Sequence, residues 1–353
     1  MSRARPWNDP LYDEARALHA RAGAVDLHLD SILQHRLLGA DLRRRHRPGI
    51  RGQPLLGHAD VPRLLEGGFA GACLGIVTWP RESDVAWREL NRQLDYLERL
   101  CASDARCLRV RTAGDWDLAR ETGRLALAPG IEGAHPLAGK LERVETLARR
   151  HTAYVTLTHF SKNAAATPAV GRGAKAEEGL TAFGRDLVTA LNGHGIAVDI
   201  AHVSRRGVLE VCELTTAPLL CSHTGARALF DHARNVSDEE IDAIAATGGV
   251  IGIYLSPTGL AGRLRADSDV AANHLLHVIE RVGVAHAALG SDLDGFPPTI
   301  LSDHRDCRDV VKVTDALLRR GLPADDVELI LGGNARRLFR AVRRAGRDGA
   351  CPS

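Results

Sequence analysis

The segment AVDLHLDS, residues 24–31, places two side chains that can bind a metal, His28 and Asp30, two positions apart. Apolar residues alternate with them, which is typical of a β-strand, and residues at i and i+2 of a strand point to the same face. Two interpretations are open at this point. The pair belongs either to the solvated face of a half-exposed edge strand or to the ligand set of one metal ion.

Polar side chains recur at or next to the ends of seven of eight short apolar runs along the chain. The runs cover residues 24–30, 69–77, 125–133, 153–159, 196–202, 217–223, 248–254 and 286–292. The polar side chains are His28 with Asp30, Glu132, His159, His202, His223, Tyr254 and Asp292. Such a regular placement favours a functional site over eight unrelated structural roles.

Amphipathic segments that are typical of helices separate these runs, for example residues 84–103 and 181–195. We expect Thr181 to cap the second segment, and Ser237 and Glu240 have the spacing of a capping box. Eight strands alternating with helices predict an α/β fold, a (β/α)8 TIM barrel with insertions. An open doubly wound sheet is the alternative, although no GxGxxG motif follows the first strand.

Length and composition limit the classes of protein that fit. The chain has 353 residues, 44% of them apolar, and a net charge of +2. We expect a single barrel domain over residues 1–353, with the barrel itself over about residues 24–341. The near-neutral charge argues against a nucleic-acid-binding protein, and the basic run at residues 41–49 lacks aromatic neighbours, which favours a solvated loop.

The cysteines and the start of the chain bear on its location. Seven cysteines occur without CxxC spacing, which favours reduced thiols over a disulfide framework. The opening MSRARPWNDP is not followed by an apolar segment, and no apolar run is long enough to span a membrane. We therefore expect a soluble, cytoplasmic protein that neither enters a membrane nor is exported by a cleaved signal.

The residue types at the strand ends favour a binuclear metal site. Nitrogen and carboxylate ligands without thiolates are typical of zinc or a similar divalent metal, such as manganese or cobalt. A single catalytic ion needs three protein ligands, whereas two ions that share a carboxylate can use five. Glu132 is the expected bridge, together with a hydroxide, because a carboxylate has two oxygens to share. The five predicted ligands are His28, Asp30, Glu132, His202 and His223.

Three further residues suit the chemistry of acyl transfer around such a centre. Asp292 could take the proton of the nucleophilic water and pass it to the leaving amine, although a turn or helix-cap role is open. His159 could donate a hydrogen bond to the developing oxyanion, or it could be a core histidine. Arg234 could bind a substrate carboxylate through a bidentate contact, or it could be a surface arginine.

At these residues the sequence resembles the membrane (renal) dipeptidase family, the M19 peptidases of the amidohydrolase superfamily. The segments DLHLDS, GIEGAHPL, VDIAHVS, CSHTGA, RNVSDE and GSDLDG carry the resemblance, and the matching segments run in family order from about residue 24 to 341. The resemblance implies a zinc-dependent dipeptidase with the same ligands and the same roles for Asp292, His159 and Arg234. It adds Tyr254, whose main chain would help to hold the substrate carboxyl end. It also implies cleavage of L,L- and L,D-dipeptides and a homodimer.

Two positions depart from the family pattern. Leu29 stands where the family has a small polar residue, and Phe160 stands where it often has Asn. The loop at residues 31–60 is also rich in arginine. These differences leave the metal chemistry unchanged and concern the choice of substrate.

Three functions fit these residues. The first is a dizinc dipeptidase. The second is another binuclear amidohydrolase that acts on a non-dipeptide amide or a lactone, and the third is a non-catalytic barrel within a biosynthetic pathway. Arg234 favours the first, because it suits a free C-terminal carboxylate, and the complete ligand set argues against the third.

Overall fold

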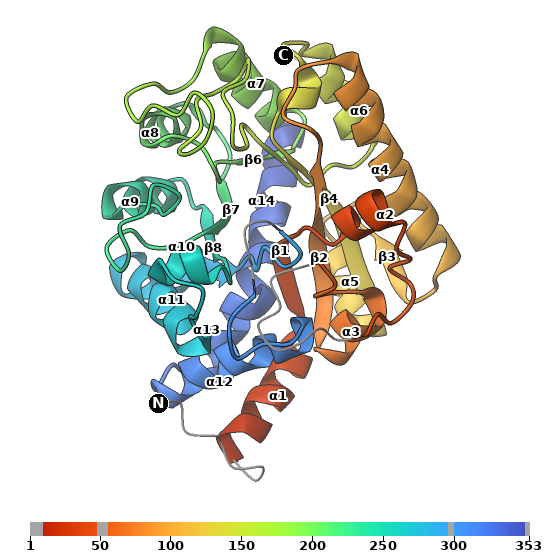
Figure 1. Cartoon of the computed structure of the whole chain (residues 1–353), viewed down its shortest axis with the longest axis vertical. Helices are drawn as coiled ribbons and strands as arrows, with labels where there is room; N and C mark the ends of the chain where they lie inside the picture. The colour runs from red at the N-terminus through yellow and green to blue at the C-terminus, as the bar shows by residue number, and fades with distance from the viewer. Residues whose placement is uncertain (1–9, 48–55, 296–299, 350–353) are drawn as a thin grey trace.

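A ring of parallel strands surrounded by helices forms the centre of the molecule (Figure 1). The structure is a computed structural model that describes residues 10–47, 56–295 and 300–349. All pairs between its strands are parallel, in the order β1-β2-β4-β5-β6-β7-β8-β9, with β3 paired to β4. The strands are β1 (Ala24–Leu29), β2 (Phe69–Val77), β3 (Cys107–Arg109), β4 (Leu125–Glu132), β5 (Tyr154–Thr156), β6 (Ala197–Asp199), β7 (Leu220–Thr224), β8 (Val250–Ile253) and β9 (Ala287–Leu289).

The ring is nearly closed by contacts between the end of β1 and the segment after β9. The amide of Asp30 donates to the carbonyl of Leu293, and the amide of Asp292 donates to the carbonyl of His28, each at 2.9 Å. Leu29 and Leu293 form a parallel bridge between these two bonds. The predicted (β/α)8 TIM barrel is thus confirmed, and the doubly wound alternative is wrong.

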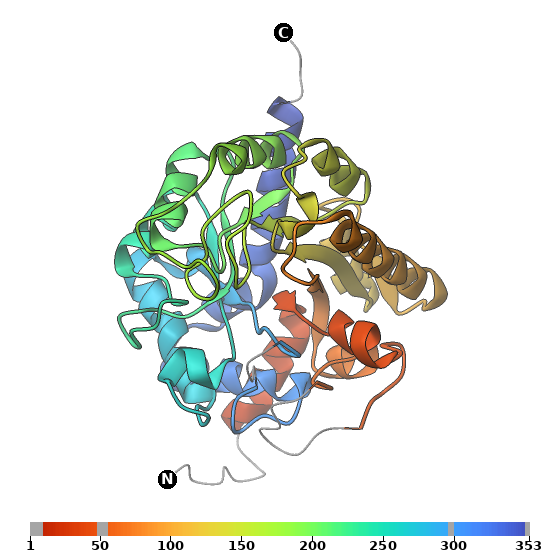
Figure 2. The same cartoon turned by 45° about the horizontal axis from the view of Figure 1, so that its top comes forward.

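The helices lie outside the strands, as the view into the ring shows (Figure 2). They are α1 (Pro10–Ala22), α2 (Ile32–Leu38), α3 (Val61–Glu66), α4 (Asp84–Ser103), α5 (Asp115–Thr122), α6 (Glu142–Arg149), α7 (Ala182–Gly193), α8 (Arg205–Leu214), α9 (Asp238–Ala246), α10 (Pro257–Ala261), α11 (Ser268–Val282), α12 (Val311–Arg319), α13 (Ala324–Glu328) and α14 (Asn334–Gly349). Apolar residues from the strands and the inner helix faces form the core between the two layers.

Local sequence signals place several helix ends correctly. Helix α4 covers the predicted segment 84–103, and the Thr181 hydroxyl accepts the Gly184 amide at the start of α7. At the start of α9 the Ser237 amide donates to the Glu240 carboxylate at 2.7 Å, and the Ser237 hydroxyl accepts the Glu240 amide. The capping box satisfies amides that would otherwise lack partners in the first turn.

The strands differ from the predicted runs in two respects. Strand β3 was not predicted; it has only three residues and pairs beside the first half of β4, while β5 pairs beside the second half. The runs that contain His202 and Asp292 end as strands three residues before these side chains. Both residues have positive φ, 65° and 59°, so the chain turns there instead of continuing the strand.

The first strand is not an edge strand, contrary to one of the two initial interpretations. Every residue of β1 is buried, and β1 pairs with β2 on one side. The ring closure described above lies on its other side. A strand buried on both faces has no solvated side, so His28 and Asp30 need partners inside the protein.

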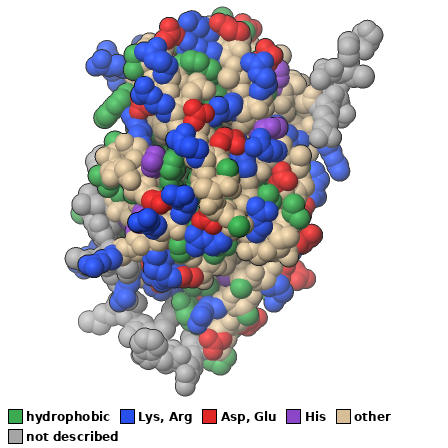
Figure 3. Space-filling view, turned by 90° about the vertical axis from the view of Figure 1, so that its right-hand side faces the viewer, with side chains coloured by type: hydrophobic (Ala, Val, Ile, Leu, Met, Phe, Trp, Pro, Cys, Tyr) green, Lys and Arg blue, Asp and Glu red, His purple; other side chains and the backbone are tan. Residues whose placement is uncertain are grey.

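Charged side chains of both signs are interspersed on the face that α4 and α6 cover (Figures 1 and 3). Several form ion pairs there, such as Arg150 with Asp95 at 2.6 Å. Within the described ranges, no helix combines the length and apolar character needed to cross a bilayer. The six cysteines that the structure describes are free thiols.

The buried His274 connects α11 to the loop after β7 and to helix α10. Its Nδ1 accepts the Ala226 amide at 2.9 Å, and its Nε2 donates to the Leu260 carbonyl at 3.0 Å. Burial lowers the pKa of His274 to about 4. The folded chain therefore holds this imidazole neutral at a pH where the unfolded chain protonates it.

We expect this histidine to contribute to acid unfolding. Its contribution to stability is complete above about pH 6.5 and is lost as the pH falls toward 4, because only the unfolded state takes up the proton. The slope approaches about 1.4 kcal/mol per pH unit for one such group. Urea unfolding of the metal-free chain at several pH values measures it. In His274→Gln the free energy of unfolding should fall less steeply with decreasing pH than in the unchanged chain. If both chains lose the same free energy of unfolding between pH 8 and pH 4, the prediction is wrong.

Candidate metal centre and substrate cavity

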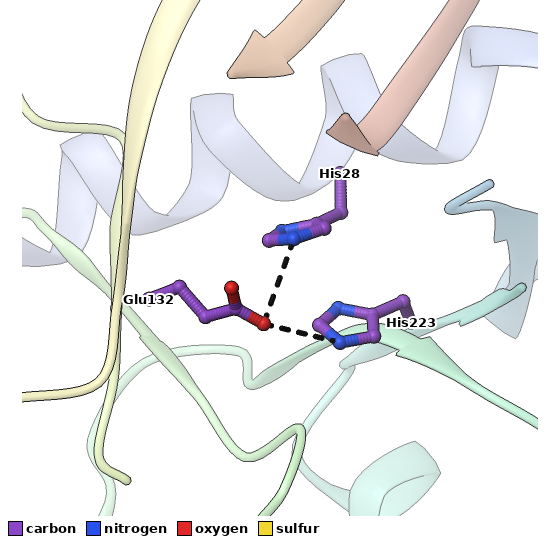
Figure 4. A group of neighbouring side chains, drawn as sticks. All are labelled: His28, Glu132 and His223. Carbon is purple, nitrogen blue, oxygen red and sulfur yellow. Dashed lines mark ion pairs between the residues drawn. The ribbon is translucent and has the colours of Figure 1, made fainter. Parts of the chain in front are cut away.

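Three predicted ligands from three different strands converge at the carboxyl end of the barrel (Figure 4). His28 comes from β1, Glu132 from β4 and His223 from β7. Glu132 Oε1 lies 3.6 Å from His28 Nε2 and 3.5 Å from His223 Nε2. All three side chains are buried, so the centre lies inside the mouth of the barrel.

The other two predicted ligands join the same centre. His202 Nε2 lies 3.0 Å from Glu132 Oε1 and 2.9 Å from His223 Nε2. Asp30 Oδ1 lies 3.3 Å from His28 Nε2. The structure therefore brings all five together, with one oxygen of Glu132 facing three imidazole nitrogens.

His159 and Asp292 lie within the same cluster. His159 Nε2 is 3.7 Å from Glu132 Oε1, and Asp292 Oδ1 is 3.9 Å from His28 Nε2. Three overlapping sets of side chains are close enough to share an ion. They are His28 with Glu132 and His223, Glu132 with His159 and His202, and His28 with Asp30 and Asp292.

The donor atoms of this cluster fit divalent metal ions. His28 Nε2, Asp30 Oδ1 and Glu132 Oε2 are buried and have no hydrogen-bond partner. Buried polar atoms are normally paired, because leaving one unpaired costs about 1–3 kcal/mol. A cation would satisfy these atoms, and imidazole with carboxylate is a donor set that zinc accepts.

Two glycines make room for this arrangement. A Cβ at Gly75 would lie 2.2 Å from Asp30 Oδ1, so β2 passes directly against the ligands. A Cβ at Gly130 would lie 2.0 Å from the Tyr154 ring, whose hydroxyl contacts His28 Nδ1 at 2.6 Å. Any other residue at these positions would displace a ligand or the group that orients it.

Burial and crowded carboxylates dominate the electrostatics of the metal-free centre. Burial, together with the charge of Asp30, raises the pKa of Glu132 well above its usual range and that of Asp292 to about 7. Burial opposes protonation of His28, but Glu132, Asp30 and Asp292 outweigh it and raise the pKa to about 10. The centre thus attracts positive charge, which bound cations would supply.

A cavity of about 300 Å³ opens beside this cluster. It is lined by Asp30, Glu132, His159, Phe160, Val170, His202, His232, Arg234, Tyr254, Ser256, Thr258, Gly259 and Asp292. Its volume is at the lower end of the range for small-molecule sites. The cavity therefore has room for a small substrate next to the predicted ligands.

Arg234 and Tyr254 lie in the wall of this cavity. Arg234 is 8% exposed, and its guanidinium donates to the His223 carbonyl at 3.3 Å, so it is not a surface arginine. The Tyr254 hydroxyl donates to Asn235 at 2.6 Å. Its main-chain N–H donates to the Thr224 carbonyl at 3.0 Å, which already gives this amide a partner within the sheet.

Asp294, two residues after Asp292, is completely buried and has a structural role. Its carboxylate accepts hydrogen bonds from Ser31 Oγ, Gln34 Nε2 and the amides of Gly57, His58 and Ala59, at 2.6–3.2 Å. It therefore fastens the segments after β1 and before α3 to the rim beside Asp292. The repeated Asp in GSDLDG is the one signal that marks it.

The two departures from the family pattern have different surroundings. Leu29 is fully buried in β1, whereas Phe160 lines the cavity. Part of the loop at residues 31–60 forms α2, and none of its described residues lines the cavity. Residues 48–55 of this loop lie outside the described residues.

The model of one protein family, described as membrane dipeptidase, peptidase family M19, matches residues 12–351. The chain belongs to this family. It is therefore a metallo-dipeptidase, a hydrolase that acts on dipeptides, and a metal cofactor belongs to its site. The family predicted from the sequence motifs is confirmed.

Individual relatives agree with this assignment. Dipeptidase tcpJ from Claviceps purpurea is 32% identical over 301 residues, which are 82% of this chain and 70% of that protein. An uncharacterized dipeptidase from Schizosaccharomyces pombe is 32% identical over 262 residues, 72% of this chain and 62% of that protein. A metallopeptidase from Rhodobacter sphaeroides, solved with a phosphinate mimic of the dipeptide L-Ala-D-Ala, has the same fold. Its TM-score is 0.81 at 23% identity, over 91% of this chain and 99% of that chain.

Proposed function

We propose that this M19 peptidase hydrolyses dipeptides with two zinc ions held at the barrel mouth. The observation that supports this most directly is the position of Glu132, whose Oε1 lies within 3.6 Å of nitrogens of His28, His202 and His223. A carboxylate with one oxygen beside three imidazole nitrogens and a second oxygen that is buried without a partner suits a bridge between two ions.

The remaining four predicted ligands would divide between the two ions. His28 and Asp30 would hold one ion with Glu132, and His202 and His223 would hold the other. When bound, such ions lower the pKa of water so that it attacks as hydroxide at neutral pH, and they polarise the scissile carbonyl. The remaining steps depend on side chains of the chain itself.

Asp292 is the proposed proton carrier. It lines the cavity and lies 3.9 Å from His28 Nε2, on the side of the cluster that holds Asp30. From there its carboxylate can take a proton from the attacking water and deliver it to the leaving amine. The positive φ of Asp292 turns its side chain out of the strand direction.

His159 and Arg234 are the proposed substrate contacts. Burial lowers the pKa of His159 to about 3, so its imidazole is neutral and can donate one N–H to the oxyanion. Arg234 offers a guanidinium fork in the cavity wall, which suits a free carboxylate. The Rhodobacter sphaeroides relative, with its L-Ala-D-Ala mimic, supports a test of L,D-dipeptides as well as L,L-dipeptides. The homodimer and the cytoplasmic location stay predictions.

The first prediction concerns the substrate. The zinc-loaded chain should release amine from members of a panel of L,L- and L,D-dipeptides, and a strong chelator should abolish this release. The comparison of the two series gives the stereochemical preference. If the panel gives no amine while about two zinc ions remain bound, the proposed zinc-dependent cleavage of these dipeptides is wrong, and another amide or a lactone becomes the substrate to test.

The second prediction isolates Asp292. Asn is isosteric and tolerates the same positive φ, so Asp292→Asn should keep its zinc content and its fold. Its kcat should fall about 10²–10⁴-fold, because the proton carrier is lost. Zinc analysis beside steady-state kinetics measures both. Full activity in this variant would remove Asp292 from the mechanism.

The third prediction tests the contact between Arg234 and the substrate carboxylate. Arg234→Ala should raise KM for a cleaved dipeptide about 10–100-fold, because a charge-assisted contact is lost. The same dipeptide with an amidated C-terminus supplies the control, since it has no carboxylate to lose. An equal loss for both substrates, or an unchanged KM for the free dipeptide, would contradict the assignment.

A further inference from the structure

A buried aspartate lies directly beneath the predicted second metal site. Asp199 is the last residue of β6, three residues before His202, and it is completely buried. Its Oδ1 accepts two main-chain amides, from Ser222 at 2.8 Å and from Ala201 at 3.2 Å. Its Oδ2 accepts two hydroxyls, from Ser222 at 2.7 Å and from Thr156 at 2.5 Å. The two oxygens therefore face different kinds of donor.

The hydroxyl of Ser222 connects this carboxylate to His223. Ser222 Oγ lies 2.8 Å from His223 Nδ1. Because a serine hydroxyl has a single proton and Oδ2 of Asp199 takes it, Ser222 Oγ can only accept from the imidazole. Nδ1 of His223 must then carry the ring proton, and the lone pair of the neutral ring is on Nε2.

That lone pair points into the metal centre. His223 Nε2 lies 2.9 Å from His202 Nε2 and 3.5 Å from Glu132 Oε1. A histidine binds metal only through an unprotonated nitrogen, so the tautomer decides whether this ring can be a ligand. At His28 the partner of Nδ1 is the Tyr154 hydroxyl, which can either donate or accept.

We propose that Asp199 is a positioning residue that fixes the proton of His223 through Ser222, which leaves Nε2 free to bind the second zinc ion. The metal part of this inference depends on the proposed function, whereas the tautomer of the metal-free ring does not. The imidazole of His223 donates to Ser222 Oγ only while Oδ2 of Asp199 accepts the Ser222 hydroxyl proton. The four hydrogen-bond donors around Asp199 therefore determine which nitrogen of His223 carries the proton when Asp199 is replaced.

Asp199→Asn should reverse the direction of the hydrogen bonds. The two main-chain amides require an acceptor, so the carboxamide oxygen faces Ser222 N and Ala201 N. The carboxamide NH₂ then faces the two hydroxyls and donates to Ser222 Oγ. The Ser222 proton turns to Nδ1 of His223, and the ring proton moves to Nε2, where it blocks metal binding.

Zinc titration of the chelator-stripped chain in metal-buffered solution provides the first test. In Asp199→Asn one of the two zinc sites, the one that His223 joins, should lose about 10–100-fold in affinity, and the other site should change little. Thr156→Val is the matched control, because it removes the other hydroxyl on the same Oδ2 without touching His223. It should keep both affinities within about threefold, below the range expected for loss of an orienting partner. Two zinc ions bound by Asp199→Asn as tightly as by the unchanged chain would overturn the proposal.

Nitrogen NMR of the metal-free, histidine-labelled chain provides the second test. His223 should show a protonated Nδ1 in the unchanged chain and in Thr156→Val, and a protonated Nε2 in Asp199→Asn. Ser222→Ala, which removes the connection and keeps Asp199, serves if Asp199→Asn does not fold; its zinc affinity should fall in the same way. A protonated Nε2 in the unchanged chain would refute the inference, whereas absent dipeptide cleavage with the expected tautomer would refute only the proposed function.

Discussion

The structure depends on three carboxylates and four imidazoles that lie together, buried or nearly so, at one end of a nearly closed barrel. Glu132 is 4% exposed and Asp30 5%, and both approach His28 within 3.6 Å. Like charges this close in a dry interior repel, which is why burial and Asp30 together raise the pKa of Glu132. Cations relieve that repulsion and occupy the unpaired donor atoms at the same time. Metal binding and the native structure of this end of the barrel are therefore thermodynamically linked.

A parallel barrel is suited to this task because it gathers the carboxyl ends of strands that are far apart in the sequence. His28 and Asp292 are separated by most of the chain, yet a main-chain hydrogen bond joins them at the point where the ring closes. The chain then turns sharply at His202 and Asp292, where φ is positive. Such backbone costs energy for residues other than glycine, and it persists where the surrounding structure requires it. Here the positive φ directs the side chains of His202 and Asp292 toward the centre, whereas a continued strand would direct them elsewhere.

Short-range features of the sequence predict much of this arrangement. The apolar runs, the caps at Thr181 and Ser237 and the polar residues at strand ends depend on neighbours within a few positions, so they can be recognised in one sequence. Strand β3 and the ring closure depend on pairing between distant segments, which no local pattern encodes. The same holds for Asp199, whose four donors come from β5, the turn after β6 and β7. The sequence marks it only as a polar residue in an apolar run, which does not distinguish a positioning group from a ligand.

Under the proposed function, the selection of substrate side chains would depend on Phe160, which lines the cavity but is not one of the predicted metal ligands. Phe160 has a φ of 41°, and its ring lies 4.5 Å from the His159 ring and 4.9 Å from the His202 ring. Its carbonyl accepts the Arg172 amide at 2.9 Å, and a Cβ at Gly171 would come within 2.1 Å of that carbonyl, so the backbone here is closely packed. Metal ions and Arg234 would bind groups that every dipeptide has, and these contacts do not discriminate between side chains. An aromatic ring at this position instead excludes water next to the reacting groups, which strengthens the electrostatic interactions there. It also leaves a polar substrate side chain without a partner on that wall, and the cost of burying an unpaired polar group makes such a wall selective.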